Sequence, residues 1–158
     1  MLPYRVGIRG FCLLVFAWVA FGCVDNFSAD IQIVNPPVIQ SVEAEGTGHI
    51  IRVGVFNTEV GFAGYRLFTG ATADEAQNAP LNSGSDCGPL AVIPNISVEY
   101  IIEVKPGITG VDSSLGGFRL CAIDASLTAG QFVALRSLIF QNLTSLGVSI
   151  SSNAAQVP

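Results

Sequence analysis

Few residues in this chain have side chains that could transfer protons or attack a substrate near neutral pH. The sequence has one histidine, His49, one lysine, Lys105, and four cysteines. His49 is the sole candidate for an acid or base near neutral pH. It follows Gly48 at the start of a predicted strand, with no cysteine nucleophile and no nucleophile elbow in the sequence. We therefore interpret His49 as a surface histidine and predict that the protein is not an enzyme.

The acidic residues do not form a pattern typical of catalysis or of metal binding. Glu99 and Glu103 fall on the predicted solvent-facing side of one strand, where acids normally serve solubility. Asp112 begins a polar stretch that lacks the acidic repeat and the terminal Glu of a calcium loop. Two distant cysteines and one distant histidine are too few for a tetrahedral zinc site. We expect no metal and no other cofactor.

Acidic residues also occur in the longest segment without a strong strand pattern. Gly70–Pro89 is poor in hydrophobic residues and rich in Gly, Asn, Ser and Pro, so it is predicted to be a loop. Residues 72–77 within it are compatible with one helical turn, with Thr72 as its cap. The predicted contact residues for a protein ligand are the acids of this segment, Asp74, Glu75 and Asp86.

The N-terminal residues have the pattern of a secretory signal. Two arginines precede an unbroken apolar run of 11 residues, Phe11–Phe21, and a small residue follows. A membrane-spanning helix needs about 20 apolar residues, so an uncleaved transmembrane anchor is the least favoured interpretation. Ala20 and Gly22 satisfy the small-x-small rule of ordinary secretory cleavage. The pattern therefore predicts export, with a signal peptide at residues 1–22.

The end of this signal also carries a second pattern. Ala20-Phe21-Gly22-Cys23 resembles the lipobox of bacterial lipoproteins, in a relaxed form similar to that of spirochaete-type lipoproteins. The resemblance implies that Cys23 is acylated and becomes the new N-terminus. It further implies that the lipid holds the exported protein on a membrane, in the outer membrane or at the cell surface. Ordinary secretion without a lipid remains the alternative.

Counting the cysteines favours one disulfide. If Cys23 is acylated and Cys12 leaves with the signal, Cys87 and Cys121 remain as an even pair in an oxidising compartment. A bridge between them closes a loop of about 34 residues, which stabilises the folded state by roughly 3–4 kcal/mol on the chain-entropy model. We therefore predict a disulfide between these two cysteines.

The charge of the chain restricts its partners. Without residues 1–22, the chain keeps five basic and twelve acidic residues, a net charge of −7. Such a surface repels phosphate backbones, so nucleic acid is excluded as a partner. The same sign opposes electrostatic docking on anionic lipids. Attachment to a membrane must therefore come from acyl chains.

Composition and alternation indicate how the chain is organised. Few charges and many Gly, Val, Ile and Phe residues favour strands over helices. We expect a tether at 23–37, a β-domain at 38–147 and a flexible tail at 148–158. Alternation is strongest at 49–57 and 98–105. The other predicted strands are 38–43, 65–69, 90–93, 117–124 and 131–143. The last of these also fits a helix, but we predict a strand because the strand at 117–124 would otherwise be left unpaired.

Six or seven short strands in a domain of about 110 residues predict an all-β, immunoglobulin-like sandwich. Gly64-Tyr65-Arg66-Leu67-Phe68 is similar to the third strand of fibronectin type III domains. Phe118-Arg119-Leu120-Cys121-Ala122 looks like their aromatic-x-aliphatic-x-Ala sixth strand. The chain departs from that family because the buried second-strand Trp is missing, and because the sixth strand has Phe where a Tyr is usual.

The alternation of the predicted strand at 117–124 also orients the disulfide. If it holds, Phe118, Leu120 and Ala122 point into the core and Cys121 points outward. The disulfide would then strap the loop at 70–89 across the outside of a sheet. A loop restrained in this way is suited to contact with a partner, although the bridge is also explained by loop entropy alone.

Together these patterns favour a membrane-anchored envelope lipoprotein. The expected function is a non-catalytic surface adhesion or protein-binding module, whose loops contact a protein ligand. The alternative is a structural or assembly component on the periplasmic face of the envelope. A fold of this kind does not separate these two functions.

Overall fold

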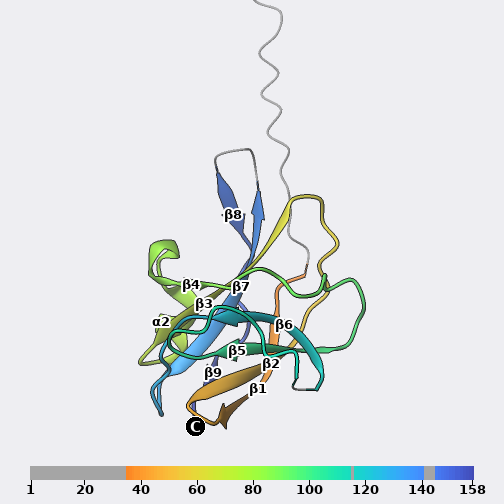
Figure 1. Cartoon of the computed structure of the whole chain (residues 1–158). Helices are drawn as coiled ribbons and strands as arrows, with labels where there is room; N and C mark the ends of the chain where they lie inside the picture. Colours follow the sequence, from red (N-terminus) through yellow and green to blue (C-terminus); the bar gives the residue numbers. More distant parts are fainter. Residues whose placement is uncertain (1–34, 115, 141–144) are drawn as a thin grey trace, which may run out of the picture. The chain divides into compact units, whose positions relative to one another are not determined.

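Strands in two β-sheets are the main regular structure of the described chain (Figure 1). The computed structural model describes residues 35–114, 116–140 and 145–158. The predicted signal, Cys23 and most of the predicted tether lie outside these ranges. None of the helices within them has the length and apolar character needed to cross a membrane. The predicted all-β sandwich is confirmed at the level of two sheets with very little helix.

The two sheets differ in strand direction. Across sheet A the strands are β1 (Val38–Glu45), β2 (Gly48–Gly54), β5 (Glu99–Val104) and β6 (Phe118–Ile123). Across sheet B they are β4 (Ser85–Asp86), β3 (Phe62–Gly70), β7 (Phe132–Phe140) and β8 (Leu146–Val148), and β9 (Ala155–Gln156) also pairs with β7. Only β5 and β6 are parallel among the described pairs. The remaining elements are α2 (Ala73–Asn78) and the 3₁₀ turn η1 (Leu81–Ser83).

Most predicted strands are found close to their predicted positions. The ambiguous segment 131–143 is a strand over the residues of β7, as predicted. Residues 90–93, by contrast, do not form a strand. The helical turn in the segment 70–89 is present as α2, and the Thr72 hydroxyl caps it by accepting the backbone N–H of Glu75 at 3.2 Å. Local patterns thus located most of these elements.

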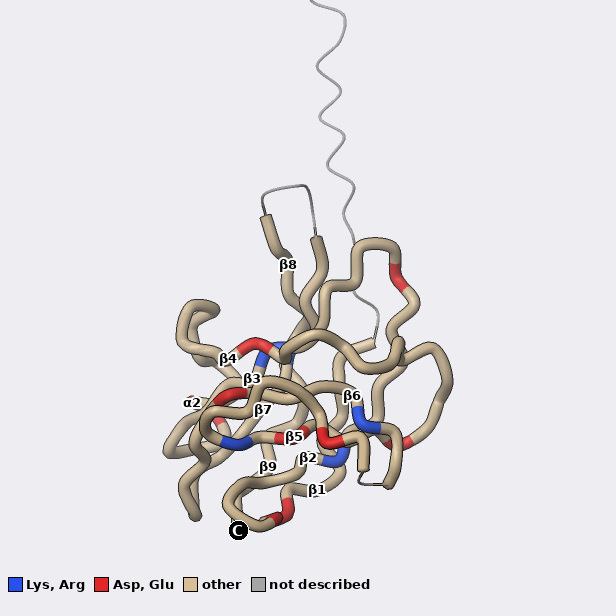
Figure 2. The backbone as a smooth tube through the Cα atoms, viewed as in Figure 1, with Lys and Arg blue, Asp and Glu red and all other residues tan. Residues whose placement is uncertain are grey.

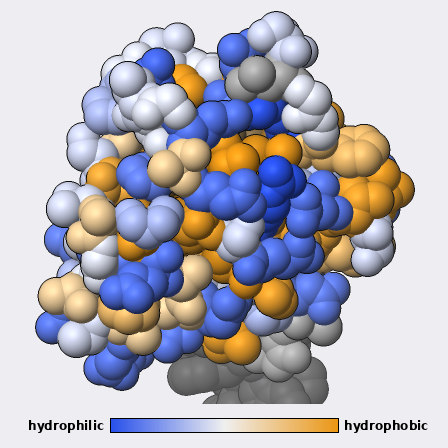
Figure 3. Space-filling model, turned by 90° about the horizontal axis from the view of Figure 1, so that it is seen from below, coloured by the Kyte–Doolittle hydropathy of each residue, from blue (hydrophilic) through white to orange (hydrophobic). Residues whose placement is uncertain are grey.

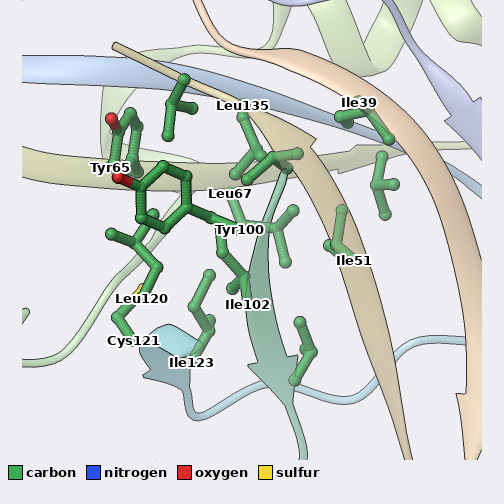
Figure 4. Close-up of a cluster of buried hydrophobic side chains, with 14 of the residues drawn as sticks. Ile39, Ile51, Tyr65, Leu67, Tyr100, Ile102, Leu120, Cys121, Ile123 and Leu135 are labelled. Atoms are coloured by element: carbon green, nitrogen blue, oxygen red, sulfur yellow. The ribbon is translucent and has the colours of Figure 1, made fainter. Parts of the chain in front are cut away.

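The hydrophobic core lies between the two sheets (Figure 4). Ile51 and Ile102 come from neighbouring strands of sheet A, and Leu67 and Leu135 come from neighbouring strands of sheet B. All four side chains are buried. Successive side chains of a strand point to opposite faces, so the apolar alternation of β2 and β5 supplies one wall of this core.

Cys121 belongs to this core, so the prediction that it points outward is wrong. In the pairing of β5 with β6, Ile101 lies opposite Arg119 and Ile102 lies opposite Cys121, which leaves Leu120 as an extra residue. This bulge interrupts the inward and outward alternation of side chains along β6, because Leu120 has no partner on β5. Leu120 and Cys121 are both buried, whereas Phe118, which was predicted to point inward, is half exposed.

The sheets are joined at one edge by the disulfide. Cys87 follows β4 and is bridged to Cys121 on β6, with their Cα atoms 5.7 Å apart. Beside the bridge, Gly88 and Ala91 donate backbone N–H groups to carbonyl oxygens of β6 at 2.8 Å. The two cysteines are paired as predicted. The bridge, however, connects the two sheets and does not cross the outside of one of them.

The C-terminal residues join the sheets at the other edge. The Asn153 side chain accepts the backbone N–H of Ile39 at 2.8 Å and donates to the carbonyl oxygen of Ile39 at 2.9 Å. Val157 is buried in the core, directly after β9. The prediction of a flexible tail at 148–158 is therefore wrong, because its small polar residues bond to β1 and β7.

Two serine hydroxyls, those of Ser149 and Ser152, accept backbone N–H groups of β7 in place of backbone carbonyls. Ser149 Oγ accepts the backbone N–H of Ser137 at 2.9 Å, and Ser152 Oγ accepts that of Leu135 at 2.9 Å. Both N–H groups belong to buried residues of β7. Buried N–H groups need an acceptor, so these two hydroxyls complete the edge of sheet B.

We expect Ser152→Ala to lower the free energy of unfolding by about 1–3 kcal/mol, because the buried N–H of Leu135 loses its acceptor. Urea unfolding followed by circular dichroism would measure the change. Ser151→Ala is the matched control, since the Ser151 hydroxyl has no hydrogen-bond partner among the described residues. Equal losses in the two variants would contradict this role for Ser152.

Candidate functional site

The strand register defines two ends of the domain. Gly54 lies opposite Glu99 in sheet A, so β2 ends where β5 and its parallel neighbour β6 begin. Loop 55–61 leads from there to the start of β3, where β7 ends and β8 begins. Asn35, the first described residue, contacts this loop through its carbonyl, which accepts Asn57 Nδ2 at 3.4 Å. We call these strand ends and their loops the entry end.

Large apolar side chains are exposed mainly at the entry end. Val60 in loop 55–61 is 94% exposed, and Phe140 at the end of β7 is 53% exposed. Phe140 donates its backbone N–H to the carbonyl of Gly61 at 2.8 Å, and it lies opposite Leu146 on β8. These contacts place the three apolar residues together. The exposed apolar residues of this end are Val38, Phe56, Val60, Ile93, Ile96, Phe118, Phe140 and Leu146.

Figure 3 shows the domain from below, the side away from loop 55–61 and β8 in Figure 1. Hydrophobic residues gather at the right-hand edge of this view, the side on which Figure 1 places the segment that leads into β5. Near this side, Val38, Phe56 and Val98 line a shallow hollow of about 440 Å³. Most of the exposed apolar side chains of the described chain thus lie on the loops and strand ends of one end.

A second hollow, of about 450 Å³, lies at the opposite end of sheet A. Its charged lining residues are Glu45, Glu103, Lys105 and Asp112. Residues of 105–112, after β5, form part of it, because a connection between parallel strands must return across the sheet to the end at which the first strand began. We call this feature the charged hollow, and Figure 2 shows the charged residues around these strands.

Glu103, one of the residues that line the charged hollow, belongs to a buried ion pair. Arg119 Nη1 donates to Glu103 Oε1 at 2.6 Å, and their side chains are only 7% and 9% exposed. The backbone N–H of Asp112 donates to the same carboxylate at 3.1 Å. The prediction that Glu103 faces solvent is therefore wrong, because Arg119 and the backbone of Asp112 lie against its carboxylate. Glu99, as predicted, remains exposed.

The other carboxylates of the charged hollow are more accessible. The Ser114 hydroxyl and backbone N–H donate to Asp112 Oδ1 at 2.6 and 2.9 Å, and these bonds lower the pKa of Asp112. Asp112 thus contributes stability above its unfolded-state pKa, and this contribution is lost as the pH falls through its folded-state pKa. Glu45 is exposed at the rim, 3.9 Å from Arg119 Nη2. The accessible charged residues of the hollow are therefore Glu45, Asp112 and Lys105.

The three predicted contact acids lie on two elements. Asp74 and Glu75 are on α2, where Asp74 accepts a hydrogen bond from Asn78 and Glu75 accepts the backbone N–H of Ala71, both at 2.8 Å. Asp86 is on β4 and accepts Arg66 Nη2 at 2.8 Å. All three are exposed, and each has a partner inside the domain.

The remaining predicted residues are also placed by the register. His49 is half-buried on β2, opposite Ala44 on β1 and Val104 on β5. Cys23 lies outside the described residues. In the part of the chain that is described, no group of three or more His, Cys, Asp and Glu side chains is arranged to hold a metal ion.

Sequence reasoning missed the ion pair and the exposed apolar side chains of the entry end. One signal for the pair was present, because Arg119 is the only charged residue in the apolar strand Phe118–Ile123. A charge buried in such a strand requires a partner. The entry end had no comparable signal, since its apolar residues are spread between positions 38 and 146.

Comparisons with known proteins identify no relative of this chain. No protein-family model, no curated protein and no solved structure matches this chain. The basis for inferring a function is therefore the contrast between the apolar entry end and the charged hollow at the opposite end.

Proposed function

We propose that this protein is an envelope lipoprotein, anchored through an acylated Cys23, that acts as a non-catalytic adhesion or protein-binding module. The observation that carries this proposal is the polarity of the domain. The chain enters beside exposed apolar residues at one end, and the charged hollow lies at the other. The twelve residue-to-residue steps from Cys23 to Asn35 can span at most about 40 Å, so the lipid keeps the entry end within that distance of the membrane.

In this arrangement, the charged hollow faces away from the membrane. Glu45 and Asp112 present carboxylates there beside the Lys105 ammonium, which suits a protein ligand that offers both a basic and an acidic side chain. Asp74 and Glu75 remain proposed contact residues, because α2 begins three residues after β3 ends, away from the entry end. The net charge of the exported chain supports a protein ligand and not a nucleic acid.

The strand order supports an immunoglobulin-type relationship. In that fold, strands A, B and E share one sheet, and strands C, F and G share the other. Here β1, β2 and β5 share sheet A, while β3, β7 and β8 share sheet B. The departure is β6, which resembles the sixth strand in sequence but lies beside β5 in parallel. We propose that β7 takes the sixth-strand position and that β6 is an addition to the fold.

The anchor gives the most direct test of the proposal. We expect Cys23→Ser to move the protein from the membrane fraction to the soluble fraction, because the lipid is the proposed attachment. Immunoblotting of fractionated cells after a high-salt wash would measure this. The matched control is Cys12→Ser, which changes a cysteine inside the predicted signal and is expected to leave the protein on the membrane. Retention of the Cys23→Ser variant on washed membranes would contradict the proposal.

Protease treatment of intact cells separates adhesion from the structural alternative. A binding module displayed outward is expected to be cleaved without permeabilising the cells. A structural component on the periplasmic face is expected to be protected until the outer membrane is opened. Protection in intact cells would therefore contradict the adhesion function and support the structural role on the periplasmic face.

A further inference from the structure

The entry end presents an apolar surface that the described domain leaves uncovered. Val60 projects from loop 55–61 with 94% of its surface exposed, and the backbone bond between Gly61 and Phe140 holds this loop against the end of β7. Leu146 extends the surface on β8. Large exposed apolar groups that lie together mark contact sites for other proteins or for membranes.

The carboxylates beside this surface have hydrogen-bond partners within the domain. Both carboxylate oxygens of Glu59 accept Asn57 Nδ2, at 3.2 and 3.3 Å, and Glu99 accepts Arg52 at 2.7 Å. The accessible charges of the hollow, Glu45, Asp112 and Lys105, lie at the opposite end. An apolar surface whose neighbouring acids are already bonded suits a lipid interface better than it suits a charged protein ligand.

The position of the chain entry identifies the occupant. Asn35 contacts Phe56 and Asn57 in the same loop that carries Val60. If Cys23 is acylated, as the proposed function requires, the chain between them can span at most about 40 Å. The apolar surface is thus tethered close to a bilayer, where insertion of its side chains removes apolar area from water.

We infer that the entry end docks on the bilayer that holds the lipid anchor, with Val60, Phe140 and Leu146 in the interfacial region. Apolar side chains of surface-bound proteins enter the boundary between headgroups and acyl chains to a depth of about 5–10 Å. Docking gives the domain a fixed orientation and turns the charged hollow toward the aqueous phase. This inference rests on the acylation of Cys23.

Tryptophan reporters test the docking in the acylated full-length protein. The only tryptophan, Trp18, lies in the predicted signal, so the processed chain has none of its own. Val60→Trp places a reporter on the surface at a position with almost no packing to lose, and Phe140→Trp is a second reporter. Leu81→Trp is the matched control, at an exposed apolar residue between α2 and β4. Each protein is purified from membranes and reconstituted into phosphatidylcholine vesicles that contain brominated lipid.

We expect the Val60→Trp and Phe140→Trp proteins to lose most of their fluorescence to the brominated lipid and to shift their emission to the blue. The Leu81→Trp protein is expected to keep both its intensity and its wavelength. If the fluorescence of the reporters at positions 60 and 140 is not quenched in a protein whose mass confirms acylation, the docking is overturned, whereas the proposed lipid anchor is not. A blue shift that depends on protein concentration and occurs in detergent without lipid would assign the surface to a second copy and also overturn it. An unmodified Cys23 in the mass spectrum would contradict the proposed function and, with it, the docking.

Discussion

Glu103→Leu is expected to lower the free energy of unfolding by about 3–5 kcal/mol, the loss typical of removing one partner from a buried ion pair. The Arg119 side chain that remains is 7% exposed and leaves a buried cation without its partner. Its Nε atom has no partner among the described residues, and Glu45, at 3.9 Å, is beyond hydrogen-bond distance. The variant also removes the acceptor for the backbone N–H of Asp112.

Urea unfolding at neutral pH measures this effect, and two variants identify its cause. Glu99→Leu removes an exposed acid of the same strand that pairs with Arg52, and it is expected to cost at most about 1 kcal/mol. The double variant Glu103→Leu/Arg119→Met removes both buried charges and is expected to recover most of the lost stability. If the double variant is less stable than Glu103→Leu alone, the loss comes from packing and not from the unpaired charge.

Removal of the disulfide is the second large effect. The double variant Cys87→Ala/Cys121→Ala is expected to lose roughly 2–5 kcal/mol of unfolding free energy, because the unfolded chain is no longer restrained and the sheets lose their covalent link. Cys121 is fully buried, so the alanine also leaves unfilled space in the core.

Reduction of the wild-type protein provides the control for this variant. Dithiothreitol is expected to lower the urea midpoint of the wild type and to leave that of the double variant unchanged. Peptide mapping without reduction should recover residues 87 and 121 as one linked peptide pair. Recovery of both as free, alkylatable thiols from the exported protein would contradict the bridge and the explanation that depends on it.

Local information in the sequence determined the nature and the positions of most strands. Ile51, Val53 and Val55 alternate with more polar residues, and all three are buried, because each strand presents alternate side chains to the core. Thr72 was recognisable as a helix cap, since its hydroxyl bonds an N–H three residues away. The pairing of Cys87 with Cys121 was predicted because these two cysteines remain when Cys12 is assigned to the signal and Cys23 to the lipid.

Tertiary structure decided every feature that depends on which strands become neighbours. Glu103 is buried because β5 and β6 are parallel. The connection that follows β5 therefore returns along the sheet and places Asp112 against a side chain that the alternation predicted to face solvent. Cys121 faces the core because of one extra residue in β6. The segment 148–158 is ordered because β1 and β7 offer it partners.

The same holds for the two ends of the domain. The acids and apolar residues that form them are far apart in the chain, and only the register of the strands brings them together. A sequence pattern reports the neighbours of a residue along the chain, whereas these surfaces are made by contacts across strands. The sequence by itself therefore determined a pair of cysteines and a set of strands. The tertiary structure decided the buried ion pair, the charged hollow and the apolar entry end.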